Sequence, residues 1–252
     1  MKAATKDFDS LMEKLQEQHD KASVDMYLPS LQEVIKAKKI TVEQQTQILT
    51  GALTQETQQN VFSYNRVISE IILKNCKDPE DINLIDKIPL AIQFRIDTIG
   101  ETLEIEGIQY NIKDHINSVY PLVESRIRDT LAQQEHTTDT GINIIFTCPP
   151  LYIDFDVNKS AEEKWTSLQG EEIVSELFKV EISKYIQQIN FQDESINVHE
   201  LNFDERMKVC NLLPMSSSKA LVDYIEKVKD IETQYISISG SIIPMNASLF
   251  GA

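Results

Sequence analysis

Two aspartates in the segment YIDFDVN come nearest, by type and spacing, to an arrangement that could do chemistry. Asp154 and Asp156 lie two positions apart, so on a β-strand both carboxylates would point to the same face. Two carboxylates on one face could bind a magnesium ion. An ordinary amphipathic strand, with Tyr152 or Ile153 turned inward and the aspartates in water, has the same sequence. The pair is therefore a candidate site with a plain structural alternative.

The triplet Glu162-Glu163-Lys164 follows shortly after and is loosely similar to the E-x-K of metal-dependent nucleases. A nuclease needs a basic groove along the phosphate backbone, whereas this chain has 24 Lys and Arg against 40 Asp and Glu, a net charge of −16. That excess argues against binding nucleic acid by neutralising phosphates and against docking on an anionic membrane. A small acidic metal-dependent hydrolase using Asp154 and Asp156 is kept only as an alternative hypothesis.

The remaining polar motifs predict no catalytic, metal or cofactor site. Adjacent residues on a helix point about 100° apart, so neither His19-Asp20 nor Asp114-His115 can hold an ion by itself. Only 7 glycines occur, where average usage would give roughly 18, and no phosphate-binding glycine motif is found. We expect no cofactor, no metal and no small-molecule substrate. The cysteines are far apart and predict buried free thiols: Cys76, Cys148 and Cys210.

Helical spacing of apolar residues dominates the chain. Thr41 and Gln44 form a capping box in front of one such pattern, and Pro214 ends another. Six glutamines between residues 44 and 59 form either a protein-binding surface or a solvated face. The predicted helices begin after Thr41 and span residues 61–76, 86–100, 116–131, 173–189, 203–213 and 216–231.

Shorter segments alternate with period two. A hairpin is predicted over residues 101–113, with its turn at Glu106-Gly107. Two strands are predicted within 141–158, on either side of Pro149-Pro150, and a short one at Ile196 and Val198. Residues 25–40 begin extended, and then fit either a brief helix capped by Ser30 and Glu33 or a strand with Val34, Ile35 and Ile40.

Mixed helices and strands without regular alternation predict an α+β fold, mainly helical with short antiparallel strands and hairpins. The loop EHTTDTG is the best internal boundary. We therefore predict an N-terminal amphipathic helix over 1–24, a helical region with a β-hairpin over 25–135, and an α+β region over 136–252. The last two could equally form one continuous domain.

The N-terminal helix carries the best candidate for a partner-binding site. Its apolar residues Phe8, Leu11, Met12 and Leu15 fall at i, i+3, i+4 and i+7, which places them in one stripe. Such a terminal helix docks either on its own domain or on a partner. The segment is too charged for a signal peptide, and no run approaches the roughly 20 apolar residues of a membrane span. We expect a soluble, intracellular protein.

Several segments, taken in order, resemble the baseplate hub family of T-even-like contractile-tailed bacteriophages. Each segment is only weakly specific, and their order and spacing over residues 26–250 carry the resemblance. The last of them has a single Phe250 where the family often has a pair. The segments are MYLPSL at 26–31, ITVEQQTQIL at 40–49, IDKIPLAIQFRIDTIGE at 85–101, ELFKVEISKYIQQI at 176–189, FDERMKVCNLLP at 203–214 and IIPMNASLF at 242–250.

The resemblance implies a non-enzymatic protein that helps to build the baseplate hub through protein contacts. It brings no catalytic residues to this chain. Within the family, some members resemble hub components and others resemble assembly factors that are absent from the finished particle. The N-terminal extension favours an assembly factor. The implied partners are other hub and spike proteins, in the host cytoplasm during assembly or in the virion baseplate. A generic soluble adaptor remains a further alternative.

Overall fold

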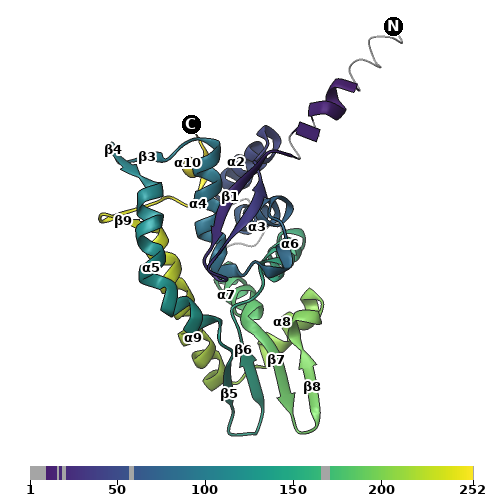
Figure 1. Cartoon of the computed structure of the whole chain (residues 1–252). Coiled ribbons are helices and arrows are strands. Elements are labelled where there is room, and N and C mark those ends of the chain that lie inside the picture. Colours follow the sequence, from purple (N-terminus) through teal and green to yellow (C-terminus); the bar gives the residue numbers. More distant parts are fainter. Residues whose placement is uncertain (1–9, 16, 19–20, 57–59, 166–170, 252) are drawn as a thin grey trace.

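Helices make up most of the computed structural model (Figure 1). It describes residues 10–15, 17–18, 21–56, 60–165 and 171–251. The mixture of helices with small antiparallel sheets confirms the predicted α+β class. The helices are α2 (Val42–Glu56), α3 (Ser63–Asn75), α4 (Lys87–Thr98), α5 (Ile112–Leu131), α6 (Leu151–Lys164), α7 (Glu171–Tyr185), α8 (Phe203–Leu212), α9 (Met215–Ile236) and α10 (Ala247–Phe250), with 3₁₀ turns at Pro79–Asp81, Leu84–Asp86 and Val198–Glu200.

All strand pairs in the described part of the chain are antiparallel. Three two-stranded hairpins pair β1 with β2, β3 with β4, and β9 with β10. One four-stranded sheet has the order β5-β6-β7-β8. The strands are β1 (Ser23–Leu28), β2 (Glu33–Lys38), β3 (Thr102–Ile105), β4 (Ile108–Asn111), β5 (Gln134–Thr137), β6 (Asn143–Phe146), β7 (Ile186–Phe191), β8 (Glu194–Asn197), β9 (Ser237–Ile238) and β10 (Ser241–Ile242).

Local sequence signals account for several of these elements. The capping box before α2 is confirmed, since Thr41 Oγ1 accepts from the Gln44 amide and Gln44 Oε1 accepts from the Thr41 amide. The β3–β4 hairpin is also confirmed. Its turn residues Glu106 and Gly107 both have positive φ, 52° and 81°, as a two-residue type I′ turn requires. Between Ser30 and Glu33 the chain turns from β1 into β2, so the strand alternative is correct there.

The predicted second strand after Pro149-Pro150 is wrong, because residues 151–164 form helix α6. Its buried face includes Leu151, Asp154, Asn158 and Ala161, which follow the spacing of a helix. Two of these four are polar. The apolar residues alone therefore do not show the helical pattern. The alternation of Ile153 with the two aspartates indicates a strand instead.

The long helix predicted over 173–189 is wrong in its last four residues. Helix α7 ends at Tyr185, and Ile186 to Ile189 begin strand β7. The strand pairs with β6 on one side and β8 on the other, with a bulge at Ile145/Phe146. The predicted loop at 135–141 is likewise partly strand β5, which pairs with β6. Val198 lies in a 3₁₀ turn and not in a strand.

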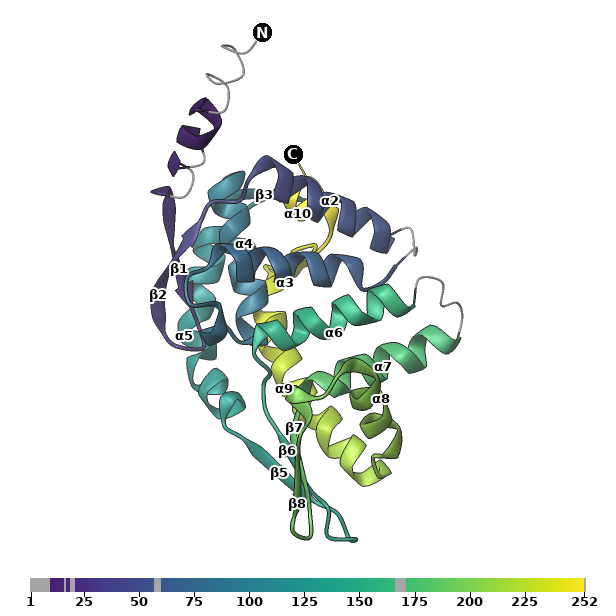
Figure 2. The same ribbon diagram turned by 90° about the vertical axis from the view of Figure 1, so that its right-hand side faces the viewer.

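One large hydrophobic cluster joins elements from the whole length of the chain, from Met26 in β1 to Phe250 in α10. It contains residues from both sides of the predicted boundary at 135/136, for example Val123 and Ile144. A smaller cluster joins Phe62, just before α3, to residues of α6, α7 and α8, among them Ile153 and Met207. Figure 2 shows α6 between α3 and α7, which brings the polar face of α6 into the interior.

No helix among the described residues is both long enough and apolar enough to cross a membrane.

Candidate functional site

The predicted partner-binding helix extends away from the rest of the molecule (Figures 1 and 2). Residues 10–15 are helical, and the side chains of Leu11, Met12 and Leu15 are 54%, 48% and 50% exposed. Phe8, the fourth residue of the predicted stripe, lies outside the described residues. An apolar stripe that is half exposed to water is typical of a surface that another protein covers.

Asp154, the first candidate catalytic residue, is instead the centre of a buried ionic cluster. It is 2% exposed. Its two carboxylate oxygens accept from the Nζ atoms of Lys87 and Lys184, at 2.7 and 2.8 Å. They also accept from Ser69 Oγ at 2.7 Å and Asn158 Nδ2 at 2.9 Å. Four donors surround this carboxylate, so it is held by α3, α4, α6 and α7 together.

The charges in this cluster determine one another's protonation. Burial would raise the pKa of Asp154, but the ammonium groups of Lys184 and Lys87 outweigh it and lower that pKa well below its ordinary value. Burial would lower the pKa of Lys184, but Asp154 and Glu181 together raise it. Asp154 is therefore an ionised, fully paired carboxylate and not a general base that is free to accept a proton.

The cluster borders a cavity of about 400 Å³. Glu181 lies at its wall and receives Lys184 Nζ at 2.9 Å and Lys229 Nζ at 3.6 Å. Glu232 lines the same cavity, and burial, helped by the negative charge of Glu181, raises the pKa of Glu232 to about 7. The cavity therefore combines ion pairs with a carboxyl group that titrates near neutrality. Its lining residues are Gln55, Tyr64, Asn65, Ile68, Leu84, Lys87, Ile88, Asp154, Leu177, Glu181, Lys184, Lys229, Glu232 and Met245.

The paired carboxylates that a hydrolase would need are not brought together. Positions 154 and 156 on a helix point about 200° apart, and Asp156 is exposed while Asp154 is buried. Glu162 accepts from Ser63 Oγ at 2.5 Å and from Arg66 Nε, and Lys164 pairs with Asp204. Within the described part of the chain, no group of three or more His, Cys, Asp or Glu side chains could hold a metal ion.

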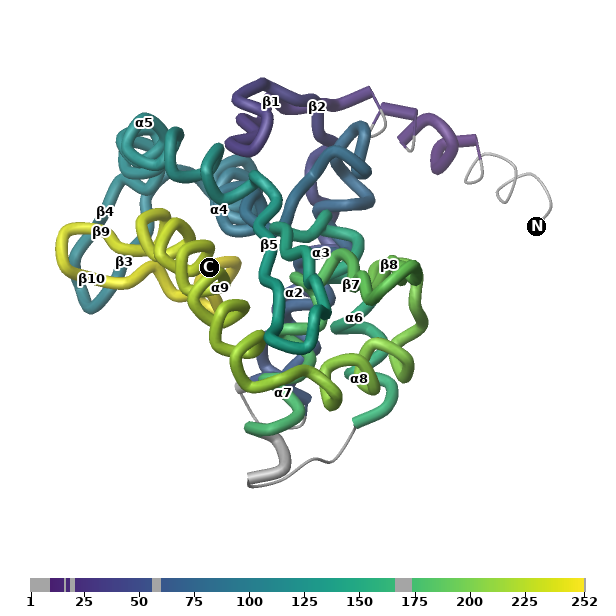
Figure 3. The backbone as a smooth tube through the Cα atoms, turned by 90° about the horizontal axis from the view of Figure 1, so that it is seen from below, coloured from purple at the N-terminus to yellow at the C-terminus, as the bar shows by residue number. Residues whose placement is uncertain are grey.

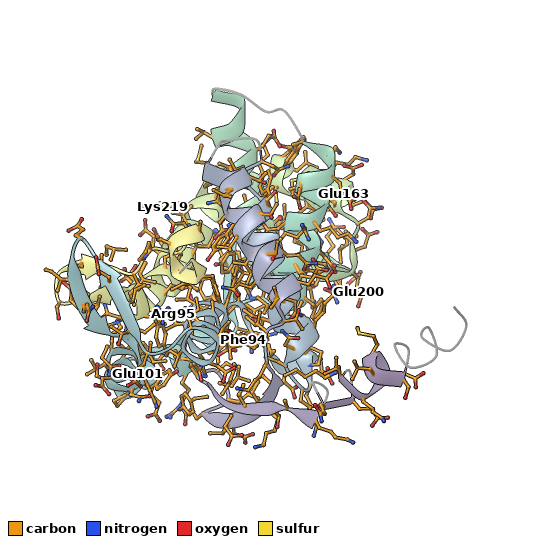
Figure 4. The ribbon with its side chains drawn as sticks, turned by 90° about the horizontal axis from the view of Figure 1, so that it is seen from above. Phe94, Arg95, Glu101, Glu163, Glu200 and Lys219 are labelled. Carbon is orange, nitrogen blue, oxygen red and sulfur yellow. The ribbon has the colours of Figure 1, made fainter. Side chains whose placement is uncertain are left out.

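Further buried charges hold backbone segments together. Arg95, beside Phe94 on α4 (Figure 4), donates to the carbonyls of Gly100 and Thr102 and so joins the end of α4 to β3. Arg206 donates to the carbonyls of Leu201 and His199, at 3.0 and 2.6 Å. These side chains satisfy main-chain groups at element ends that would otherwise lack partners.

Asp86 has a similar structural role between the N-terminal hairpin and α4. Its carboxylate accepts from the amides of Ser30 and Asn83, at 2.8 and 2.9 Å. Burial raises the pKa of Asp86 to about 6 in spite of these hydrogen bonds. The side chain thus fixes the turn after β1 against the start of α4.

The other predicted polar motifs are also structural where they are described. His115 Nε2 lies 3.0 Å from the carbonyl oxygen of Tyr235, while His19 and Asp20 lie outside the described residues. The cysteines are free and buried, as predicted. Burial raises the pKa of the Cys76 and Cys210 thiols to about 12, so neither is a reactive thiolate at neutral pH.

The glutamine-rich segment is partly internal. Gln44 Nε2 donates to Asn75 Oδ1 at 3.0 Å, and Gln45 Nε2 donates to the Phe250 carbonyl at 2.9 Å. Gln55 borders the cavity, and Gln58 and Gln59 lie outside the described residues. These contacts attach α2 to α3 and to α10, so part of the segment stabilises the fold.

Sequence reasoning missed the partners of Asp154. Lys87 and Lys184 stand beside the apolar residues Ile88 and Tyr185, and a lysine at such a position is usually assigned to the surface. The available signal was the helical spacing of Asp154 and Asn158 with Leu151 and Ala161. This spacing predicts a buried helical face only if polar residues are counted among its members.

Comparison with known proteins supplies the family. The family model described as T4 bacteriophage base plate protein matches residues 21–238. No curated protein and no solved structure matches the chain. The matched region covers every described element from β1 to β9. It therefore includes the ionic cluster and the four-stranded sheet, and leaves out the exposed N-terminal helix. The chain belongs to the T4 bacteriophage base plate protein family, and its role is in the structure or assembly of a phage baseplate, among protein partners.

Proposed function

We propose that this chain is a non-enzymatic assembly protein of the baseplate hub, acting through protein contacts with other hub and spike proteins. It works in the host cytoplasm while particles are assembled. The observation that carries the proposal is the exposed stripe of Leu11, Met12 and Leu15, on a helix that extends away from the core. The alternative within the same proposal is that the protein remains in the finished virion as a hub component.

Family membership supports the baseplate part of the proposal, and the ionic cluster supports the non-enzymatic part. Asp154, the best candidate for catalysis, has its carboxylate oxygens occupied by four protein donors. Helix 10–15 lies outside the matched region, so its partner role rests on its exposed apolar side chains.

The first test is genetic. A phage in which this gene is deleted should accumulate baseplate wedges without complete hubs, and the wild-type gene on a plasmid should restore them. Normal infectious particles from the deletion mutant would contradict the proposal. Mass spectrometry of purified virions distinguishes its two forms, because a hub component is present in stoichiometric amount and an assembly factor is absent.

The second test addresses the stripe. Replacing Leu11, Met12 and Leu15 by serine should abolish complementation of the deletion and leave the melting temperature unchanged, since these side chains are exposed. Lys14→Gln, on the same helix between the stripe residues, is the matched control and should complement fully. Full complementation by the serine variant would contradict the assignment of the stripe, and the hub function would still stand on the deletion phenotype.

A further inference from the structure

The four-stranded sheet has one face that is mainly apolar and one that is mainly polar. Ile189 of β7 pairs with Ile144 of β6 and with Ile196 of β8, and residues directly opposite in an antiparallel sheet point to the same side. Phe191 lies two residues after Ile189 and therefore points to that side too. We call this side the apolar face. Its apolar residues are Ile144, Phe146, Ile186, Ile189, Phe191 and Ile196, and the same pairing places Gln134 and His136 of β5 and Glu194 of β8 on this side too.

Several side chains on the polar face bond to one another, although Asn143 Oδ1 is buried without a partner among the described residues. Gln188 Nε2 donates to Asn190 Oδ1 at 2.6 Å and to Ser195 Oγ at 2.9 Å. Asn143 Nδ2 donates to Glu135 Oε2 at 3.2 Å. The first of these hydrogen bonds lies within β7, and the other two join neighbouring strands, so polar side chains on this face are partnered by the sheet itself.

The apolar face is covered over only half of its extent. Ile144, Phe146 and Ile186 are buried in the main core, where the Phe146 ring lies 6.3 Å from the ring of Tyr224 on α9. At the other end, Phe191 is 43% and Ile196 is 48% exposed. Figures 2 and 3 show α7, α8 and the start of α9 on one side of the sheet, and Figure 2 shows that the hairpin tips extend past these helices.

The strands and turns of this sheet carry charged side chains of one sign. No lysine or arginine occurs in residues 129–158 or 185–205, which include all four strands. Near the uncovered half, the two hairpins carry exposed carboxylates at Asp139, Asp193 and Glu194, and Glu194 lies directly opposite Phe191. Their field attracts positive charge and repels an acidic surface. A second copy of this chain, itself at −16, is therefore a poor occupant.

We propose that Phe191 and Ile196 form a docking surface for a segment of a different protein, one that combines apolar side chains with lysine or arginine. The apolar contacts supply affinity, and the surrounding carboxylates select a basic partner and speed its approach. The chain's own N-terminal helix cannot cover the surface, because it lies at the opposite end of the molecule (Figure 1). The inference does not depend on the hub role, since any basic partner protein satisfies it.

Site-specific photocrosslinking in the full-length protein tests this. A benzophenone amino acid at position 196 should crosslink, in cells infected with the phage that carries this gene, to a different protein. The crosslinked peptide should contain apolar residues and at least one lysine or arginine. The matched control is the same amino acid at position 195, on the polar face of the same strand, which should give no such product. Equal crosslinking at both positions, no crosslinking at 196, or a crosslink to a second copy would overturn the proposal.

Affinity for the identified partner provides the quantitative test. The double variant Phe191→Ser/Ile196→Ser should weaken binding about 10- to 100-fold, as expected when central apolar contacts are lost. Asn190→Ser/Ser195→Ala, on the opposite face, should leave it within about twofold of wild type. Asp193→Asn/Glu194→Gln should slow association and reduce its salt dependence. Unchanged affinity in the apolar variant, with both proteins folded by circular dichroism, would overturn the proposal independently of the deletion phenotype.

Discussion

Single buried charged side chains in this protein connect neighbouring elements through hydrogen bonds and ion pairs. Asp154 receives donors from three other helices, Arg95 and Arg206 bind backbone carbonyls, and Asp86 binds backbone amides. Such groups stabilise only when every partner is present, because removing one leaves another buried charge uncompensated. Several of them, including Lys87 and Lys184, fall within the segments that carry the family resemblance, so those segments include structural charges as well as apolar positions.

Asp154→Asn should destabilise the protein by about 3–5 kcal/mol, since Lys87 and Lys184 would remain buried without a carboxylate between them. Asp156→Asn, two residues away but exposed, should cost less than about 1 kcal/mol. Urea unfolding at pH 7 measures both. Equal losses for the two variants would contradict the assignment of Asp154 as the centre of the cluster.

Glu232→Gln should change stability in a pH-dependent way. The folded-state pKa of Glu232 is raised to about 7 from 4.5, so folding favours the protonated form. The stability that this group contributes is present below about pH 4.5 and is lost as the pH rises towards 7. The variant should therefore melt at a higher temperature than wild type at pH 8, with the difference shrinking towards pH 5. Glu226→Gln, exposed on the same helix, should show no such trend, and a lower melting temperature for the Glu232 variant at pH 8 would contradict the prediction.

At the scale of elements, the sequence predicts where helices end better than it predicts which strands pair. Capping residues act within three or four positions, so the start of α2 follows from Thr41 and Gln44 alone. Strand β7 has no such local rule. Ile182, Ile186 and Ile189 suit a helical face, and only pairing with β6 and β8 turns the last two into strand residues.

Asn202→Ala should destabilise the protein by about 1 kcal/mol. Asn202 Oδ1 accepts from the Glu205 amide, and Glu205 Oε2 accepts from the Asn202 amide, both at 3.1 Å. Asn202→Ser retains a side-chain acceptor and should recover most of the loss in urea unfolding. No difference between the alanine and serine variants would show that this capping box does not stabilise α8.

For the whole molecule, the net charge of −16 sets how the fold responds to salt. Like-charge repulsion destabilises the compact state, and salt screens it. Raising NaCl from about 0.02 to about 0.3 M at pH 7 should raise the melting temperature, with a Debye length that falls several-fold over that range. Near pH 4.7, the isoelectric point of the sequence, the same salt range should have little effect. A melting temperature at pH 7 that is independent of salt would contradict this account.

By itself, the sequence determined the α+β class, most helix positions, the β3–β4 hairpin and the buried free thiols, because periodicity, capping and turn chemistry act over a few residues. The resemblance of its segments also led to the baseplate family that the comparison shows. Tertiary structure alone decided that Asp154 is a paired structural charge and not half of a carboxylate pair, since Lys87 and Lys184 are 67 and 30 positions away along the chain. It also decided that 151–164 is a helix and that half of one sheet face is uncovered. Burial and pairing between distant segments determine the structure wherever a polar residue faces the interior or an apolar residue faces water, because the local pattern of apolar residues predicts the opposite there.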